Sequence, residues 1–556
     1  FQAEDGIRDV ERSRGLGDVY KRQGKALPKA VLSKVLGERP ELRENIRGLM
    51  EEIEKVVEEV NSLSLEEQKE RLRGIAPELL EKKEVKKELP ELPNAEKGKV
   101  VLRLPPEPSK YLHIGHAIGF YINYLYAKKY DGKLILRFED TNPTKVKEEY
   151  YEGIRKDLRK IGIKWDEEVI MSERLKLYYG YAEKLIEEGH AYVCTCEEEV
   201  IRKNRWERKE CKCRFRSIEE NMDLWKRMHE ELYPGEAILR LRGDMKSDDA
   251  AMRDPTLFRI ITDEHPLQGK KYRVWPTYDF AVSIEDGLSV THVLRSSEFL
   301  ARTNLQNHLR SLLGLRNPTI IHYSRINIIG FVTKGREIRK LISEGKISGW
   351  DDPRLVTIRA ILRRGIHPKT IERLAKEVGL SLAQTNLEWD MIAGINREMI
   401  DDLANRYFFV PDPVRIEVKG APKVTAKLKL HPNHPERGLR VIKTKGVFYI
   451  PKEEVRPGLI RLKDLYNVEL KKERGGLVGY YAGKEISKEV KKIQWVTEEN
   501  VEVKVLVPDG LKLREVKGLG EKGMEKLRKG EIIQMERFGF GRVDEKKPLT
   551  IIFGHR

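Results

Sequence analysis

Apolar residues recur at helical spacing in the first part of the chain. Between residues 40 and 63 they lie three or four positions apart, at Leu42, Ile46, Leu49, Ile53, Val56 and Val57. This spacing places them on one face of a helix. We therefore expect a helical N-terminal domain and its linker over residues 24–97. The linker is the charged, proline-containing stretch of residues 82–99.

From residue 99 onward, short β-branched runs alternate with amphipathic stretches. The predicted strands are KVVLRL (99–104) and GKLILRFED (132–140), and the predicted helices are GHAIGFYINYLYAKKY (115–130) and EEYYEGIRKDLRKIGI (148–163). Strands that alternate with helices favour a parallel sheet covered by those helices. We expect an α/β layer in this part of the chain.

The last third of the chain changes pattern again. Residues 351–410 are mostly helical in pattern, and beyond residue 412 short strands alternate with turns. The predicted strands are GVFYIP (446–451), GLIRLKDL (458–465), VEVKVLVP (501–508), EIIQMERFGFGRV (531–543) and LTIIFGH (549–555). This pattern is typical of β-barrels. The fold class is therefore multidomain, α/β plus all-β, without internal repeats.

Length and charge narrow the class of protein. The chain has 556 residues, which suggests several domains, and its 107 Lys and Arg against 90 Asp and Glu give a net charge of +17. A polyanionic partner explains this excess, and a charge-rich surface of the thermophilic kind is the alternative. No run approaches the roughly 18 apolar residues of a membrane span, and no signal peptide is recognisable. We expect a cytoplasmic protein without membrane contact.

Residues 1–23 have no helical or strand periodicity. They resemble a translated sequencing adapter, and a natural disordered tail is the alternative. We expect no function there on either interpretation.

Two histidines, His113 and His116, mark the first candidate site. The predicted strand ends at Leu104, a proline-rich turn follows, and the next helix begins near Gly115. The histidines therefore lie at a helix N-terminus, where free N–H groups and the helix dipole favour an anion. Imidazole donors at that place can stabilise a phosphate whose charge grows in a transition state. A structural pair of histidines is the alternative.

The histidine segment RLPPEPSKYLHIGHA (103–117) closely resembles the HIGH motif of class I aminoacyl-tRNA synthetases, and within them the glutamyl and glutaminyl enzymes. Further matching motifs follow in family order: LRFEDTNP (136–143), WPTYDFAVSIEDGLSVTHVLRSSEF (275–299), HYSRINIIG (322–330) and SGWDDPRL (348–355). The resemblance covers nearly the whole chain after residue 24. Its β-rich C-terminal part resembles glutamyl-tRNA synthetases of the archaeal type.

The resemblance implies the domain organisation. It places a Rossmann-type catalytic core in two halves, 98–193 and 271–332, around an acceptor-end insertion at 194–270 that bears a zinc knuckle. A KMSKS-like loop and helical connector follow at 333–411, and anticodon-binding β-barrels at 412–556.

The reaction implied by the resemblance is ATP-dependent ligation of L-glutamate to tRNA(Glu) through a glutamyl-adenylate, with Mg²⁺. His113, His116 and Lys334 would be catalytic, and ATP would be bound by His113, Gly115, His116, Glu298 and Lys334. The KMSKS-like loop reads FVTKGREIRK (331–340), where Thr333 and Gly335 depart from the family pattern. A generic basic loop is the alternative for Lys334.

Substrate identity rests on four residues. By resemblance, Arg103 holds the substrate carboxyl group, Glu139 faces the α-amino group and Tyr278 lines the same pocket. Arg103 and Glu139 could instead be cross-strand ion partners, and Tyr278 a core residue.

Arg295 is the residue that distinguishes the two substrates. Glutamyl enzymes carry Arg at this position, where glutaminyl enzymes carry a small neutral residue, and Val282 supports the glutamyl side. An arginine there pairs with a side-chain carboxylate, whereas a neutral amide would leave its charge poorly paired. The alternative is a structural pair of Arg295 with Glu298 or Asp286.

All four cysteines lie in one segment, as Cys194-Thr195-Cys196 and Cys211-Lys212-Cys213. In a cytosolic chain such clustering indicates a metal site before a disulfide set, and four thiolates suit tetrahedral zinc. Four reduced thiols without metal are the alternative. We expect zinc to be structural.

The expected partners are tRNA(Glu), ATP and L-glutamate, and we expect a monomer. Basic residues among aromatics in the C-terminal region suit phosphates and unpaired bases. Whether tRNA(Gln) is also charged stays open. The rival functions are a glutamine–tRNA ligase, and a tRNA-binding paralogue with impaired catalysis, which only the altered KMSKS-like loop favours.

Overall fold

The computed structural model describes residues 26–28, 31–32, 35–36, 39–76, 89–473, 476–486 and 490–556. The chain divides into two compact units, Phe1–Glu88 and Leu89–Arg556. The predictions for residues 1–23 and for the first part of the linker fall outside the described residues. In the part of the chain that is described, no helix is long and apolar enough to cross a membrane.

The first unit is helical where it is described, as its periodicity predicts. It contains η1 (Pro40–Asn45), α4 (Ile46–Ser62) and α5 (Leu65–Ile75). Ile53 and Val57 of α4 are buried in a small core, whereas Ile46 is exposed. The α5 helix begins at a capping box, in which Ser64 and Glu67 each satisfy the other's backbone N–H group.

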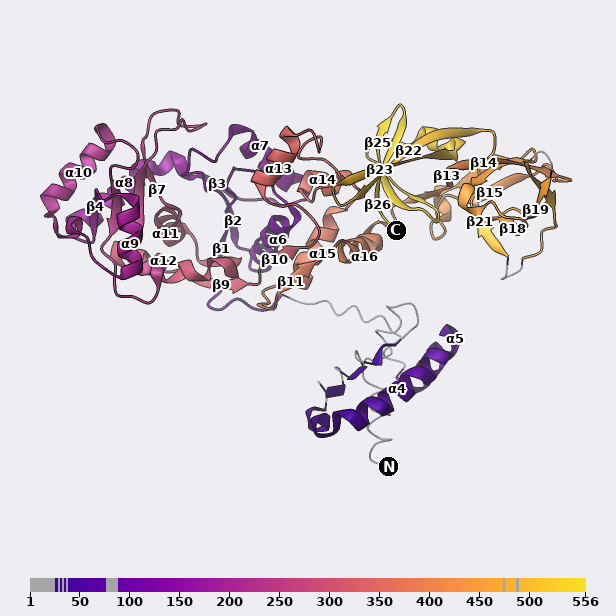
Figure 1. Cartoon of the computed structure of the whole chain (residues 1–556), viewed down its shortest axis with the longest axis horizontal. Helices are drawn as coiled ribbons and strands as arrows, with labels where there is room; N and C mark the ends of the chain where they lie inside the picture. Colours follow the sequence, from indigo (N-terminus) through magenta and orange to yellow (C-terminus); the bar gives the residue numbers. More distant parts are fainter. Residues whose placement is uncertain are drawn as a thin grey trace. The chain divides into compact units, whose positions relative to one another are not determined.

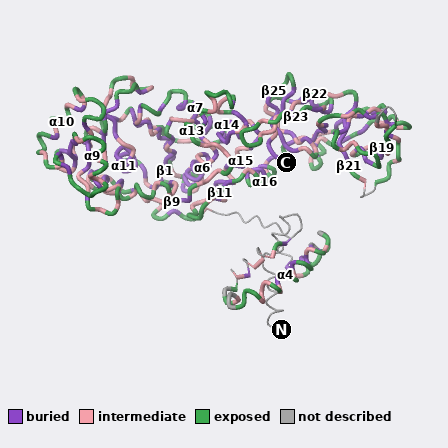
Figure 2. The backbone as a smooth tube through the Cα atoms, viewed as in Figure 1, coloured by how far each residue is buried: buried purple, intermediate pink, exposed green. Residues whose placement is uncertain are grey.

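The second unit contains the predicted parallel sheet. Strands β1 (Val101–Leu104), β2 (Lys133–Phe138) and β3 (Glu167–Ile170) pair in parallel in that order, joined by α6 (Ile114–Lys129) and α7 (Glu148–Lys160). A second parallel pair, β8 (His292–Ser296) and β9 (Thr319–Tyr323), continues the layer, because the backbone N–H of Thr291 donates to the Val101 carbonyl at 3.0 Å. Helix α6 packs against β1 (Figure 1) and is mostly buried (Figure 2).

Along the chain, four strands come between β3 and β8 and form an antiparallel sheet. They are β4 (Ala191–Cys194), β5 (Ile238–Leu241), β6 (Thr256–Ile260) and β7 (Val274–Pro276). The elements around it are η3 (Met171–Arg174), α8 (Leu175–Glu187), α9 (Glu198–Glu207), η4 (Lys212–Phe215), α10 (Ile218–Glu230) and η5 (Ala250–Met252). Then follow α11 (Tyr278–Ser289), η6 (Ser297–Arg302) and α12 (Thr303–Leu313). A separate core forms here around Trp225 and Trp275.

The connector is helical up to residue 400, apart from one short strand, and two further short strands, β12 (Asn405–Tyr407) and β13 (Phe409–Pro411), form its end. It contains α13 (Gly335–Ser343), α14 (Ile358–Arg363), α15 (Pro368–Val378) and α16 (Trp389–Ile400). The segment predicted as mostly helical also holds a short strand, β11 (Thr385–Leu387), which pairs in parallel with β10 (Ile326–Ile328). This strand is therefore tied to the chain that leads into the KMSKS-like loop.

The C-terminal region is all-β, as predicted. One sheet has the order β12-β24-β25-β26-β22-β23-β13 and another β17-β14-β20-β19-β18-β21, and β15 and β16 form a separate hairpin. The strands are β12 (Asn405–Tyr407), β13 (Phe409–Pro411), β14 (Pro413–Lys419), β15 (Thr425–Lys429), β16 (Leu439–Lys443), β17 (Val447–Pro451), β18 (Gly458–Leu462), β19 (Asn467–Glu473), β20 (Gly476–Tyr481), β21 (Lys491–Ile493), β22 (Asn500–Asp509), β23 (Lys512–Glu521), β24 (Ile532–Met535), β25 (Gly539–Lys546) and β26 (Leu549–His555). Three short 3₁₀ helices also occur there, η7 (Pro435–Arg437), η8 (Lys452–Glu454) and η9 (Lys522–Lys526).

One strand prediction in this region is wrong. Residues 531–543 form no single strand but the antiparallel hairpin of β24 and β25. The turn between them contains Arg537, whose φ of 62° lies in the left-handed region. A non-glycine residue rarely adopts this conformation, so no turn was expected at this position.

Candidate functional site

The two histidines lie at the start of α6 and hold each other in place. His113 is the N-cap residue; its Nδ1 accepts from the Gly115 N–H at 3.1 Å, and His116 Nδ1 accepts from the His113 N–H at 3.2 Å. The rings stack with centroids 3.7 Å apart. Because both Nδ1 atoms accept, the proton of each neutral ring is on Nε2, which leaves each ring a hydrogen-bond donor.

Burial keeps both rings neutral. It lowers the pKa of His113 from its ordinary value of 6.5 to about 3, with help from the nearby Lys110 ammonium. The pKa of His116 lies well below 6.5 for the same first cause, followed by the charges of His113 and Lys110. A Cβ at Gly115 would lie only 3.1 Å from the His113 ring, so this glycine gives the ring its space.

The KMSKS-like loop adjoins the histidine segment, but its lysine points elsewhere. Lys334 directly precedes α13, its side chain is 80% exposed, and its Nζ pairs with Glu337 Oε1 at 3.1 Å. The Glu298 side chain is about half-exposed, and its Oε2 lies 3.9 Å from Arg325 Nε. The structure therefore brings His113, Gly115 and His116 together and leaves Lys334 and Glu298 at the solvent side.

The predicted amino-acid pocket is built on a buried charge network. Asp286 Oδ1 lies 3.3 Å from Arg103 Nε and 2.7 Å from Arg137 Nη1, and Arg137 Nη2 lies 2.8 Å from Glu139 Oε1. Arg103 and Glu139 are thus linked through Arg137 and Asp286 rather than paired with each other. Both linking residues stand inside recognised motifs, but the sequence did not predict this link: Arg137 was not singled out, and Asp286 was considered only as a partner of Arg295.

The network sets opposite pKa shifts on its two carboxylates. Burial alone would raise the pKa of Asp286, but the Arg137 and Arg103 guanidinium groups outweigh it and lower the value. At Glu139 burial dominates and raises the pKa, although Arg137 and Arg103 oppose it. Asp286 therefore carries the firm negative charge that holds the two arginines.

Arg295 is buried, and each hydrogen bond that its guanidinium donates goes to a neutral acceptor. Its Nη1 donates to Gln306 Oε1 at 2.7 Å, its Nη2 to Thr303 Oγ1 at 2.9 Å and its Nε to His322 Nε2 at 3.4 Å. No carboxylate oxygen of the described residues lies within 4.0 Å of this guanidinium, so it forms no ion pair with Glu298 or Asp286. A buried guanidinium whose partners are all neutral can take an added carboxylate as its counter-ion.

Two aromatic side chains lie beside Arg295. The Tyr278 ring lies 5.8 Å from that of Phe299, above which the Arg295 guanidinium stands at 5.9 Å. Burial and the charge of Glu139 raise the pKa of Tyr278, so its hydroxyl keeps its proton. Val282 is fully buried in the core around Trp275.

The four cysteines converge. Their sulfur atoms lie within 4.8 Å of one another, with Cys194 and Cys211 3.9 Å apart and Cys196 and Cys213 3.8 Å apart. Arg240 Nη1 lies 3.8 Å from the Cys194 sulfur. Hydrogen bonds from the Cys194 thiol and then the Tyr192 hydroxyl lower the pKa of Cys211, although burial opposes them. The set offers the soft, partly ionised ligands of a metal site.

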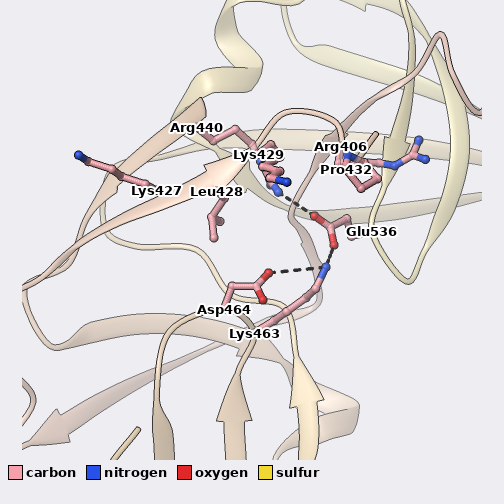
Figure 3. A pocket seen from close by; sticks show the side chains of 9 residues that line it. All are labelled: Arg406, Lys427, Leu428, Lys429, Pro432, Arg440, Lys463, Asp464 and Glu536. Carbon is pink, nitrogen blue, oxygen red and sulfur yellow. Dashed lines mark hydrogen bonds and ion pairs between the residues drawn. The ribbon is translucent and has the colours of Figure 1, made fainter. Parts of the chain in front are cut away.

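A positively charged cavity of about 420 Å³ lies in the β-rich region. Figure 3 shows its lining, with Lys463 between the carboxylates of Glu536 and Asp464. Arg440 Nη2 also pairs with Glu536, at 2.8 Å. The lining residues are Arg406, Lys427, Leu428, Lys429, Pro432, Arg440, Lys463, Asp464 and Glu536. Five cations against two carboxylates leave this cavity a net positive lining.

Three family models match the chain in succession. Residues 99–402 match the catalytic domain of tRNA synthetases class I (E and Q), and residues 404–481 and 492–544 match two anti-codon binding domains of the same family. The glutamate–tRNA ligase of Pyrococcus abyssi is 46% identical, covering 96% of this chain and 97% of that one.

Two further relatives agree. The glutamate–tRNA ligase of Pyrococcus furiosus is 44% identical, with 96% of this chain and 97% of that one covered. That of Methanothermobacter marburgensis is 41% identical, with 99% and 100% covered. Since the catalytic model alone covers more than half of the chain and these relatives match it nearly end to end, the chain belongs to the class I tRNA synthetases of the E and Q type.

Proposed function

We propose that this chain ligates L-glutamate to tRNA(Glu) at the expense of ATP. The observation that carries the proposal is Arg295, whose buried guanidinium has only neutral partners. A glutamate side chain would supply the missing carboxylate, whereas a glutamine amide would not. The relatives named glutamate–tRNA ligase support the same substrate.

The remaining pocket residues orient the reacting end of the substrate. Arg103 is fixed by Asp286 and Leu294, and offers its guanidinium to the α-carboxylate. Glu139 and Tyr278 face the α-amino group. Held in this way, a carboxylate oxygen can attack the α-phosphorus of ATP, which releases pyrophosphate and forms the adenylate.

The histidines stabilise the phosphate side of this step. The Nε2–H groups of His113 and His116 donate to phosphate oxygens, whose charge grows as the bond to pyrophosphate breaks. Lys334 reaches the phosphates when its loop closes, and Gly115 and Glu298 contact the nucleotide. In the second step a ribose hydroxyl of the tRNA end attacks the acyl carbon and AMP leaves. Mg²⁺ accompanies ATP and offsets phosphate charge.

The cysteine cluster fits structural zinc. Four thiolates at about 2.3 Å from a tetrahedral zinc ion lie about 3.8 Å apart, close to the two sulfur separations in this cluster. Cys194, Cys196, Cys211 and Cys213 would be the ligands, and a bound zinc ion would order the segment around α9. Removing zinc with a chelator is expected to lower the melting temperature, as measured by calorimetry.

The β-rich region would read the anticodon. Its two anti-codon binding domain matches and its positively charged cavity support a polyanionic partner, in line with the net charge of +17. We propose the domain boundaries given above and a monomer in solution, and we leave charging of tRNA(Gln) to the test that follows.

The test is aminoacylation with labelled glutamate or glutamine on purified tRNA(Glu) and tRNA(Gln). Glutamate transfer to tRNA(Glu) is the expected result, and transfer to both tRNAs would establish the broader activity. Glutamine transfer would favour a glutamine–tRNA ligase and contradict the role given to Arg295. Absence of any transfer would favour the tRNA-binding paralogue.

A further inference from the structure

A second lysine, Lys110, lies between the two phosphate-side loops. It stands in the turn between β1 and α6, and its Nζ is 3.5 Å from the carbonyl oxygen of Thr333 in the KMSKS-like loop. A Cβ placed on Gly335 would lie 3.2 Å from both Cβ and Cδ of Lys110. The lysine side chain therefore runs along the backbone of residues 333–335.

The ammonium of Lys110 is partly buried and has spare hydrogen-bonding capacity. Within the described ranges, no carboxylate oxygen lies within 4.0 Å of it. Two other lysines in this part of the chain do have carboxylate partners. Lys334 pairs with Glu337 at 3.1 Å, and Lys145 pairs with Glu107 at 3.6 Å. An ammonium group carries three donors, and the long contact with Thr333 occupies only one of them.

The electrostatics place the same charge beside the histidines. Burial lowers the pKa of Lys110, while the more distant Glu107 and Glu298 raise it. Its ammonium in turn lowers the pKa of both His113 and His116. The unpaired cation and the two Nε2 donors therefore lie in one neighbourhood.

We propose that Lys110 is a further phosphate-binding residue, whose ammonium contacts the β- and γ-phosphates of ATP and the pyrophosphate that leaves. This inference rests on the proposed function, because it needs ATP at the histidines. A lysine on a flexible stem acts as a point charge that suits a phosphate oxygen. The phosphate would be the counter-ion that the protein does not supply.

A purely structural role is the competing explanation. Lys110 could act only as a latch that holds the KMSKS-like loop against the turn. A second contact between the same two segments exists, since Arg339 Nη1 donates to the Ser109 carbonyl at 2.9 Å. The variant Arg339→Gln weakens this latch and leaves Lys110 in place, which makes it a matched control.

The experiment measures binding of pyrophosphate, and of a non-hydrolysable glutamyl-adenylate analogue, by titration calorimetry on the full chain. We expect Lys110→Ala to weaken pyrophosphate binding by about tenfold or more, as for the loss of a charged hydrogen bond. Binding of the analogue, which lacks the β- and γ-phosphates, should change less than about twofold. Lys110→Arg should restore most of the pyrophosphate affinity, and Lys145→Ala should have no effect.

Two results would overturn the inference. One is unchanged pyrophosphate affinity in Lys110→Ala; the other is an equal loss in Arg339→Gln, which would make the lysine a latch. The binding measurement does not depend on turnover. A wild-type chain that binds pyrophosphate through Lys110 but transfers no glutamate would contradict the proposed function alone.

Discussion

The amino-acid pocket and the phosphate-side loops differ in how their charged side chains are paired and buried. In the pocket, Arg103, Arg137 and Asp286 are buried and paired with one another. On the phosphate side, Lys334 is exposed and Lys110 has no carboxylate partner among the described residues. The network of Arg103, Arg137 and Asp286 is therefore complete in the fold itself, whereas Arg295 and the phosphate side have to be completed by their ligands.

The difference follows from solvation. A buried charge that loses its partner is costly, so the pocket charges hold one another in fixed positions. An exposed lysine in a loop can change partners cheaply because water screens both arrangements. Breaking the paired network of Arg103, Arg137 and Asp286 should therefore lower the free energy of unfolding, whereas changing the exposed Lys334 should lower the rate of catalysis.

The largest effect is expected from Asp286→Asn. It leaves Arg103 and Arg137 buried without their shared carboxylate, and the loss of one partner of a buried pair costs about 3–5 kcal/mol. The free energy of unfolding in urea measures it. Glu337→Gln, which breaks the exposed pair with Lys334, is the control and should cost under about 1 kcal/mol. Equal costs in the two variants would remove the distinction between the regions.

The next effect is expected from Arg295→Gln. Loss of a desolvated partner for a carboxylate costs about 2–5 kcal/mol in binding, so kcat/KM for glutamate should fall at least about thirtyfold. Glutamine, which forms no ion pair, should be affected much less. The Gln306 and Thr303 contacts can be replaced by the new amide, so the free energy of unfolding should change little. An equal loss of kcat/KM for glutamate and glutamine would contradict an ion pair between Arg295 and the glutamate side chain.

A smaller effect concerns pH. The pKa of His113 is about 3 in the folded chain against 6.5 ordinarily, so between these values the unfolded chain binds a proton that the folded one does not. The contribution of the neutral His113 ring to the free energy of unfolding is fully present above pH 6.5. It decreases as the pH falls, and at pH 5 it is smaller by about 2 kcal/mol. Unfolding at several pH values measures it. Because the pKa of His116 is also lowered, His113→Asn should reduce this slope without removing it, and an unchanged slope would place the His113 ring in water.

The smallest effect is expected from Lys334→Ala. The exposed lysine contributes little to stability, and kcat should fall roughly tenfold with KM for glutamate unchanged, about 1.4 kcal/mol. Steady-state pyrophosphate exchange separates the two constants. Unchanged kcat would mean that Lys334 does not reach the phosphates. A raised KM for glutamate would mean that the phosphate-side loop also acts on the amino-acid pocket, so that the two regions are not independent.

Local patterns predicted much of this molecule. The parallel layer, the histidines at a helix N-terminus and the convergent cysteines all follow from spacing within short segments. Arg137 and Asp286 were missed because they are brought together across 149 residues of chain, and no local pattern encodes that contact. The hairpin at Arg537 was missed for a local reason, since its turn lacks glycine, asparagine or proline.

The most direct test of the account is the ratio of kcat/KM for glutamate over glutamine, measured by tRNA charging with the unmodified chain. A buried guanidinium that only a carboxylate can pair predicts a ratio of about 10³ or more. Arg295→Gln should bring that ratio down by more than about tenfold. A ratio near one in the unmodified chain would contradict the claim that Arg295 selects the substrate.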